Sequence, residues 1–267
     1  MNNGKILWQQ VQLVKQKSPL VHNITNYVVM NNTANALLAA GASPIMAHAK
    51  SEIREMVNIS DAVVINIGTL DEYWSESMFI AAETANAIHK PWVLDPVGAG
   101  ATSFRDQILQ QLLEYRPTVI RGNASEIIAL AKINTTVTKG VDSTAASNDA
   151  IDAAQLLVNQ FNTVVCISGE TDIILSPDQC FMIRNGHPLM TKVTGLGCSA
   201  TALTGAFAGC SEDKTSGVAA AMALLGIAGE IASKESKGPG SLQVNLIDKL
   251  YNITEEEFIS HLKIDRK

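Results

Sequence analysis

The sequence predicts an α/β protein with a doubly wound, mostly parallel central sheet, helices on both faces, and an antiparallel hairpin near one edge. Short apolar runs alternate with helix-length segments over most of the chain, which is typical of a parallel sheet covered on both sides. Two later runs, 172–176 and 180–184, are separated by the turn dipeptide Pro177-Asp178, which favours an antiparallel hairpin. The 267 residues can bury one large core, and we expect a single domain over 1–267.

The individual elements follow from the periodicity of apolar residues. Short apolar runs without a helical period predict strands. These strands are expected at 20–22, 44–47, 62–67, 92–95, 118–121 and 163–168. Segments with a helical period predict helices. These helices are expected at 6–17, 26–40, 51–57, 75–89, 103–115, 125–132, 148–161, 198–210 and 214–234, with two amphipathic helices after them. The Thr-, Ser- and Gly-rich segment 137–147 is expected to be a loop.

Composition and charge argue against several classes of function. The formal net charge is −6 and no basic run is longer than a dipeptide, so we expect no nucleic-acid or anionic-membrane partner. The most apolar stretch, 217–228, is too short to span a bilayer. The four cysteines include no closely spaced pair, which fits neither a zinc site nor a disulfide framework. We therefore expect a protein of the reducing cytoplasm.

The run Thr194-Gly195-Leu196-Gly197-Cys198-Ser199 predicts an anion-binding site, because an Ala- and Gly-rich helical stretch follows it at once. Glycines let the backbone N–H groups approach a ligand closely, and the positive end of the helix dipole favours negative charge, above all phosphate. Cys198 lies where a proton acceptor is needed if a hydroxyl attacks a phosphoryl group. Free cysteines usually only pack in cores, but a helix N-terminus lowers the pKa of a thiol, so we expect Cys198 to be functional.

Charged and polar side chains follow three neighbouring predicted strands. Asp95 ends the strand at 92–95, Arg121 and then Glu126 follow the next strand, and Ser168 ends the strand at 163–168. Open α/β sheets bind ligands at the carboxyl ends of their strands. Taken alone, Asp95 could be a helix cap or a turn partner, and Glu126 could complete a capping box with Asn123. Together, two carboxylates and an arginine could organise Mg²⁺ and a triphosphate.

Two segments imitate a dinucleotide-binding fingerprint, and neither fits its structural context. Gly98-Ala-Gly100-Ala-Thr-Ser103 has serine where the third glycine belongs. Gly195-Leu-Gly197-Cys-Ser-Ala200 matches the pattern, but no strand with a terminal acidic residue follows its helix. A nicotinamide-dependent enzyme is therefore disfavoured.

Four motifs occur together in the chain. They are Val21-His-Asn-Ile-Thr-Asn26, Leu94-Asp-Pro-Val-Gly-Ala-Gly100, Arg121-Gly-Asn123 with Glu126, and Val193-Thr-Gly-Leu-Gly-Cys198. Over about residues 10–235 the chain resembles the hydroxyethylthiazole kinase family of thiamine biosynthesis, which has a ribokinase-like fold. The resemblance implies transfer of the ATP γ-phosphate to the hydroxyl of 4-methyl-5-(2-hydroxyethyl)thiazole, with Mg²⁺, in a homotrimer whose active sites lie between subunits.

The resemblance and the predicted anion site together imply a role for nine residues. They are Met46 and Gly195 for the thiazole; Arg121, Ser168, Asn23 and Gly197 for the nucleotide; Asp95 and Glu126 for Mg²⁺; and Cys198 for catalysis. Ser168 stands where threonine is expected in the family, and it keeps the hydroxyl. Most ribokinase-like proteins have aspartate in place of Cys198. A loose transition state with little early deprotonation of the alcohol tolerates the weaker base.

Other functions remain open at this stage. A kinase of the same fold could act on hydroxymethylpyrimidine or pyridoxal, although Met46 favours the thiazole. A lyase of this fold that repairs hydrated nicotinamide nucleotides is expected to have aspartate at position 198. A nucleotide-sensing protein without catalytic activity would bind ATP without turnover, but Asp95, Glu126 and Cys198 are all present.

Overall fold

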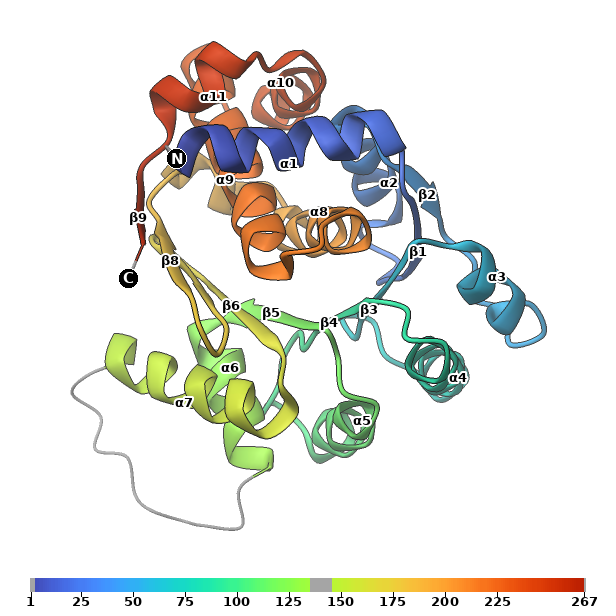
Figure 1. The fold of residues 1–267 in the computed structure, drawn as a ribbon. Helices are drawn as coiled ribbons and strands as arrows, with labels where there is room; N and C mark the ends of the chain where they lie inside the picture. The colour runs from blue at the N-terminus through green and yellow to red at the C-terminus, as the bar shows by residue number, and fades with distance from the viewer. Residues whose placement is uncertain (1–2, 135–145, 267) are drawn as a thin grey trace.

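The computed structural model describes residues 3–134 and 146–266, and the side chains of those residues except 146–148. Nine strands form one sheet in the order β2-β1-β3-β4-β5-β6-β7-β8-β9 (Figure 1). The strands are β1 Leu20–Ile24, β2 Ser43–Ile45, β3 Ala62–Asn66, β4 Trp92–Asp95, β5 Val119–Asn123, β6 Val164–Ser168, β7 Asp172–Leu175, β8 Cys180–Ile183 and β9 Ile264–Arg266. Neighbours from β2 to β6 are parallel, and neighbours from β6 to β9 are antiparallel.

Helices cover both faces of this sheet. The helices are α1 Asn3–Lys17, α2 Met30–Ala40, α3 Ile53–Ile59, α4 Glu72–Ala87, α5 Ser103–Glu114, α6 Ala124–Ile133, α7 Ala146–Phe161, the 3₁₀ helix η1 Pro188–Lys192, α8 Leu196–Cys210, α9 Lys214–Lys234, α10 Pro239–Asn252 and α11 Glu255–His261. Helices α3 to α7 lie on one face, and α1, α2 and α8 to α11 lie on the other (Figure 1). Alternate strand residues face each layer, so the buried apolar residues form two clusters, one on each side. The predicted fold class is confirmed.

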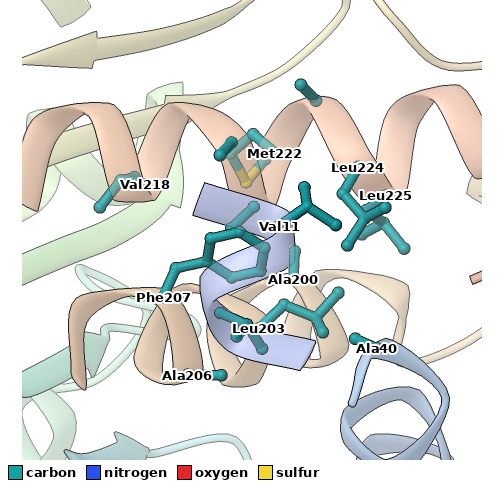
Figure 2. Packing of buried hydrophobic residues seen from close by; sticks show 14 of the residues in the cluster. Val11, Ala40, Ala200, Leu203, Ala206, Phe207, Val218, Met222, Leu224 and Leu225 are labelled. Carbon is teal, nitrogen blue, oxygen red and sulfur yellow. The ribbon is translucent and has the colours of Figure 1, made fainter. Parts of the chain in front are cut away.

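Helix α8 packs directly on the sheet because its residues are small. A Cβ atom on Gly205 would lie 2.5 Å from Cγ2 of Val64 on β3, so only glycine allows this approach. On its other side α8 packs against α9: Figure 2 shows Phe207 and Leu203 of α8 facing Met222 and Leu225 of α9. The close packing holds the N-terminus of α8 at a defined place over the carboxyl ends of the strands.

Helix α9 has the length and composition of a membrane span, and its position explains why. Its 21 residues have a mean hydropathy of 1.5 over the most apolar window, and 89% of that window is buried inside the structure. Among the residues that the structure describes, no other helix reaches this length and hydropathy. The apolar composition of α9 is accounted for by its place between α8, α1 and α10 in the core.

The expected elements are found with small shifts at their ends, and one boundary is wrong. The helix expected at 26–40 begins at Met30, because the side chain of Asn26 is drawn into contacts with Asn66 and Cys198 and residues 26–29 form a turn. Two short elements were not expected, η1 and β9. Of the loop expected at 137–147, residues 137–145 lie outside the described residues, and 146 and 147 belong to α7.

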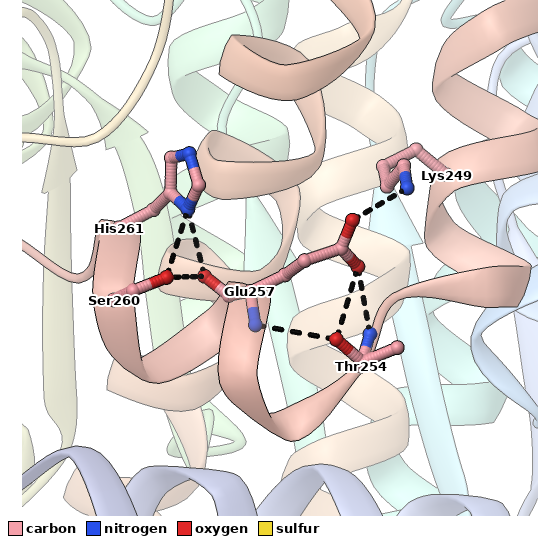
Figure 3. A network of polar contacts seen from close by, with 5 residues as sticks. All are labelled: Lys249, Thr254, Glu257, Ser260 and His261. Atoms are coloured by element: carbon pink, nitrogen blue, oxygen red, sulfur yellow. Dashed lines mark hydrogen bonds and ion pairs between the residues drawn. The ribbon is translucent and has the colours of Figure 1, made fainter.

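The C-terminal strand β9 follows a helix with strong end signals. Thr254 and Glu257 form a capping box at the start of α11, and Lys249 of α10 pairs with Glu257 at 3.0 Å (Figure 3). Beyond α11 the chain reaches the sheet edge, where Ile264 pairs with Ile183 of β8. Three residues next to a chain end carry too little periodicity to predict a strand, so β9 depends on this tertiary placement.

Replacing Asp213 with alanine is expected to lower the free energy of unfolding by about 1 kcal/mol, the usual effect of losing an N-cap. Asp213 caps α9 by accepting hydrogen bonds from the N–H groups of Thr215 and Ser216 and from the Ser216 hydroxyl. Burial raises the pKa of Asp213, but these bonds outweigh it and the net pKa is lowered. The stabilisation of the folded state by ionised Asp213 is therefore present above the ordinary aspartate pKa of about 3.9 and is lost as the pH falls below it.

Urea unfolding of the wild type and the Asp213→Ala variant at pH 7 and pH 3 measures this difference. Asp248 lies exposed in the middle of α10, and Asp248→Ala serves as the control, with an expected change below about 0.5 kcal/mol. An Asp213→Ala difference that grew at pH 3 would contradict the assignment.

Candidate active site

The carboxyl ends of the parallel strands bring the predicted polar residues to one edge of the sheet. Asn66 of β3 is paired in register with Asp95 of β4. Leu94 is paired with Ile120 of β5, which places Arg121 beside Asp95. The N-terminus of α8, with Cys198 in its first turn, lies over the same edge. The structure thus brings together Asp95, Arg121 and Cys198.

Two glycines shape the start of α8. Gly195 has φ +81°, and a Cβ atom there would lie 2.3 Å from Cγ1 of Val29. A Cβ atom on Gly197 would lie 3.1 Å from Nη1 of Arg121, so the guanidinium packs against the bare backbone of Gly197. The first N–H groups of a helix have no acceptor within the helix. This end of α8 therefore presents backbone donors beside a cation, as the predicted anion-binding site requires.

Gly195→Ala is expected to destabilise the protein by about 1 to 3 kcal/mol, because the new methyl group needs a left-handed backbone and overlaps Val29. The expected readouts are a lower urea midpoint and weaker activity, since relief of the overlap moves the N-terminus of α8. Gly240 has open space around its Cβ position, so Gly240→Ala is the matched control. A Gly195→Ala protein with the wild-type midpoint would show that Val29 moves aside freely.

Arg121 is a buried cation. Arg121 is only 9% exposed, and its Nε atom has no hydrogen-bond partner among the described residues. Among residues 3–134 and 149–266 it forms no ion pair within 4.0 Å. Burial raises the pKa of Asp95 and of Asp172, and the positive charge of Arg121 opposes this increase. A buried guanidinium with free donors beneath a helix N-terminus is suited to bind an anion of high charge.

Cys198 lies in a network of amide and carboxylate groups. The amide nitrogens of Asn26 and Asn66 lie 3.2 Å and 3.3 Å from its sulfur. The same nitrogen of Asn66 donates to Asp95 Oδ2 at 2.6 Å, and the hydroxyl of Thr201 donates to that oxygen at 2.7 Å. Asp95 is thus neither a helix cap nor a turn partner. It is joined to Cys198 through Asn66.

The pKa of Cys198 does not move in the expected direction. Burial raises it, and the nearby Asp95 carboxylate raises it further, while the hydrogen bonds from Asn26 and Asn66 and the charge of Arg121 lower it by less. The expectation of a thiol with a lowered pKa is therefore wrong, because desolvation and a like charge outweigh the stabilising contacts at this helix end. Burial also raises the pKa of Asp95 to about 6, against the opposing effect of Arg121.

Glu126 forms the capping box that was the alternative interpretation of its position. Its Oε2 accepts from the N–H of Asn123 at 2.9 Å, and Asn123 Oδ1 accepts from the N–H of Glu126 at 2.9 Å. Its Oε1 accepts from the N–H of Gly98 at 3.1 Å, which ties α6 to the loop after β4. Its negative charge still reaches the site, since it raises the pKa of Asp95.

A cavity of about 670 Å³ adjoins this edge of the sheet between β5, β6, η1, α8 and α9. Arg121, Ser168 and Gly197 line it, so three of the four residues expected to bind a nucleotide lie around one cavity. The hydroxyl of Ser168 donates to the carbonyl of Gly122 at 3.3 Å. The volume is within the usual range for small-molecule sites.

Asn23, the fourth residue of that group, is not brought to the cavity. It is fully buried on β1, its Nδ2 donates to the carbonyl of Val21 at 2.9 Å, and its Oδ1 has no partner. Met46 follows β2 on the far side of β1, where the His22 ring contacts the neighbouring carbonyl of Ala47 at 2.8 Å. The roles of Asn23 and Met46 stay predictions.

The structure adds three residues that the sequence did not single out: Asn26, Asn66 and Thr201. Asn26 lies at the end of a quoted motif, which was a usable signal. Asn66 ends an apolar strand, and Thr201 lies within an Ala-rich helix. Neither residue belongs to a sequence motif that indicates a functional site.

The fold is that of the ribokinase-like kinases, which are α/β phosphotransferases, and here the N-terminus of α8 meets the carboxyl ends of the parallel strands. Residues 11–256 match the hydroxyethylthiazole kinase family. The chain belongs to this family, which confirms the resemblance found in the motifs.

Relatives of known name agree over nearly the whole chain. It is 55% identical over 258 residues to a hydroxyethylthiazole kinase of Syntrophus aciditrophicus, covering 96% of each protein, and 54% identical over 257 residues to one of Vibrio atlanticus, covering 96% and 97%. A solved hydroxyethylthiazole kinase structure from Pyrococcus horikoshii has a TM-score of 0.91 at 44% identity, covering 98% of this chain and 99% of the other. Pyridoxal kinase of Staphylococcus aureus, at 15% identity and a TM-score of 0.68 over 93% and 98%, shares the fold.

Proposed function

We propose that the protein transfers the γ-phosphate of ATP to the hydroxyl of 4-methyl-5-(2-hydroxyethyl)thiazole, as a step of thiamine biosynthesis or salvage. The observation that carries this proposal is the buried Arg121, whose guanidinium packs on Gly197 in the first turn of α8, the turn that also contains Cys198. A group suited to bind an anion and a group proposed to accept a proton therefore lie at the same helix end. The family of the chain supplies the identity of the alcohol.

The nucleotide occupies the cavity beside β6 in this proposal. Ser168 and the backbone of Gly197 line it, and Arg121 lies where the cavity meets the end of α8. The guanidinium and the helix N–H groups would stabilise charge on the transferred phosphoryl group, which spreads over its outer oxygens in the transition state. In this proposal the acceptor alcohol binds outside the cavity, toward Gly195 and Met46.

The chemical step breaks the bond between the γ-phosphorus and the β,γ-bridging oxygen and forms one to the alcohol oxygen. The alcohol proton leaves late, because the transition state is loose. Cys198 would accept this proton in its thiolate form; where Cys198 is a thiol it would hold the hydroxyl, and the proton would leave with the transferred phosphoryl group. ADP departs with the bridging oxygen, so every atom is accounted for.

The residues at the site fit Mg²⁺ held mainly by phosphates and water. The hydrogen bonds that Asn66 and Thr201 donate to Asp95 both end on Oδ2, so its Oδ1 can take a ligand, whereas both oxygens of Glu126 accept backbone N–H groups. Within the described part of the chain no group of three or more acidic, His or Cys side chains forms a closed metal cage. Asp95 directly, and Glu126 through water, would hold the ion, which would neutralise phosphate charge when bound.

Mass spectrometry of the products tests the substrate. The purified protein is mixed with Mg-ATP and equal amounts of hydroxyethylthiazole, hydroxymethylpyrimidine and pyridoxal. Phosphate on the thiazole alone is the expected result. Phosphate on another alcohol would replace the substrate and keep the mechanism, and ATP binding without any product would favour a nucleotide sensor.

The proposal also includes a homotrimer in the cytoplasm. Large apolar side chains close to the acceptor end are exposed in one chain, with Tyr27 at 54% and Val28 at 64%, and a neighbouring subunit would cover them. The four cysteines form no disulfide with one another, which suits a reducing compartment. Light scattering after size-exclusion chromatography should give three chains per particle.

A further inference from the structure

Asn66 uses the whole hydrogen-bonding capacity of its amide within the site. Its Nδ2 donates to Asp95 Oδ2 at 2.6 Å and to Cys198 Sγ at 3.3 Å. Its Oδ1 accepts from Asn26 Nδ2 at 3.0 Å and from the N–H of Gly68 at 2.9 Å. An amide has two donors and an acceptor with two lone pairs, so no capacity remains for solvent or substrate. Asn66 is therefore part of the framework and does not touch the reactants.

The backbone next to Asn66 is held as firmly as its side chain. Arg105 of α5 donates to the carbonyls of Ile67 at 2.5 Å and of Gly68 at 3.0 Å, and also to the carbonyl of Val97 in the loop after β4. A Cβ atom on Gly68 would lie 2.8 Å from Nδ2 of Asn26, so the chain passes closely over the amide pair. Strand β3 and Arg105 thus hold the Asn66 amide in one place.

The two acceptors of the Asn66 amide are the two groups to which the proposed reaction assigns different tasks. Asp95 would hold the metal ion, and Cys198 would receive the alcohol. One amide nitrogen sets the spacing between them, because its two hydrogens leave at a fixed angle in one plane. Thr201 shares only the first task, since its hydroxyl donates to Asp95 and not to Cys198.

We propose that Asn66 is a positioning residue for phosphoryl transfer, which orients the Asp95 carboxylate so that Oδ1 takes the ligand and holds the Cys198 sulfur at a fixed distance from it. This inference rests on the roles proposed above for Asp95 and Cys198. It predicts that Asn66 affects the chemical step and leaves nucleotide binding alone, since Arg121 and Ser168 lie on other strands.

Asn66→Ala is expected to lower kcat about 10- to 100-fold, the usual range for a residue that orients a ligand or reactive group, while KM for ATP stays within a few-fold. Asn66→Ser keeps one hydroxyl donor and is expected to recover part of kcat. Thr201→Val removes one donor from Asp95 and leaves both contacts to Cys198, so its loss should be smaller than that of Asn66→Ala. Asn58 is exposed and its side chain donates to the carbonyl of Arg54 within α3, so Asn58→Ala is the matched control with unchanged kcat.

Thermal melting of each variant, and kcat per folded protein, separate positioning from stability. A structural role alone would lower the melting temperature and leave kcat per folded molecule at the wild-type value, and that result would overturn the proposal. If Asn66→Ala does not fold, Asn66→Ser and Thr201→Val still rank the effect, and wild-type kcat in both would equally overturn it.

A double-mutant cycle with Cys198→Ala tests the connection itself. Once the thiol is gone, Asn66→Ala is expected to cost less than it does in the wild type, because one of its two tasks has disappeared. If Asn66→Ala lowers kcat by the same factor in the wild type and in Cys198→Ala, the proposal is contradicted. Failure of the proposed function has a different signature: Asp95→Asn and Cys198→Ala would both keep wild-type kcat, or the wild type would leave the thiazole unphosphorylated.

Discussion

Arg121→Ala is expected to reduce kcat/KM for ATP by about 1000-fold, the upper range for losing one preorganised group that stabilises transition-state charge. The loss is large because the guanidinium is buried, has free donors and lies against the backbone of Gly197 at the start of α8. Water that replaces the guanidinium is mobile, so it stabilises the charge of the transferred phosphoryl group less well than a fixed donor does. KM for the alcohol should change little, since the proposed acceptor site lies toward Gly195 and Met46.

Arg121→Lys measures how much of this effect is charge and how much is geometry. Lysine keeps the positive charge but lacks the planar fork, so we expect the kcat/KM of Arg121→Lys to lie between that of the wild type and that of Arg121→Ala. Arg54→Ala is the matched control, because Arg54 is exposed and its side chain bonds to Glu83 and Thr84 of α4, away from the site. Unchanged kcat/KM in a folded Arg121→Ala protein would place the nucleotide phosphates elsewhere.

Cys198→Ala is expected to lower kcat between about tenfold and 1000-fold, the usual range for a general base, whereas Cys198→Asp stays active or gains activity. Asn26 and Asn66 already donate toward position 198, and their amide groups would satisfy a carboxylate there. The loose transition state needs little early deprotonation, so a thiol suffices at reduced rate. Near-complete loss in the aspartate variant would contradict the assignment of Cys198 as the base.

The pH dependence of kcat follows from the raised pKa of Cys198. Burial holds this pKa above the ordinary value of about 8.5, so the thiol is protonated at neutral pH and the thiolate fraction grows as the pH rises. If the thiolate is the base, wild-type kcat should rise from pH 7 to pH 9. An aspartate at this position is ionised throughout that interval, and the Cys198→Asp profile should be flat. Steady-state rates of both proteins across this interval provide the test.

Much of the fold could be predicted because its signals are local. Strands buried on both faces are continuous apolar runs, as at 62–67 and 92–95, and their C-terminal ends were placed within a residue or so. The hairpin of β7 and β8 followed from its turn residues. The start of α2 and the existence of β9 could not be predicted, because Asn26 is held by residues of two distant elements and β9 by its place at the sheet edge.

The candidate site divides in the same way. Asp95, Arg121, Ser168 and the glycines around Cys198 could be predicted, since strand ends and a Gly-rich helix start have a position along the chain that is visible in sequence. The direction of the Cys198 pKa could not. The helix end alone predicts a decrease, and the observed increase depends on burial and on a carboxylate that lies 103 positions away in the chain.

Patterns along the chain predict the succession of strands and helices except η1 and β9, the family, and which residue types reach the carboxyl edge of the sheet, because these depend on periodicity and on residues close together in the chain. The tertiary structure alone decided which groups touch there. Asn66 joins Asp95 to Cys198, Glu126 caps α6, and Asn23 is buried on β1. Hydrogen bonds reach only about 3 Å, so they are set by how α8 packs on β3 and β4, which no local pattern contains.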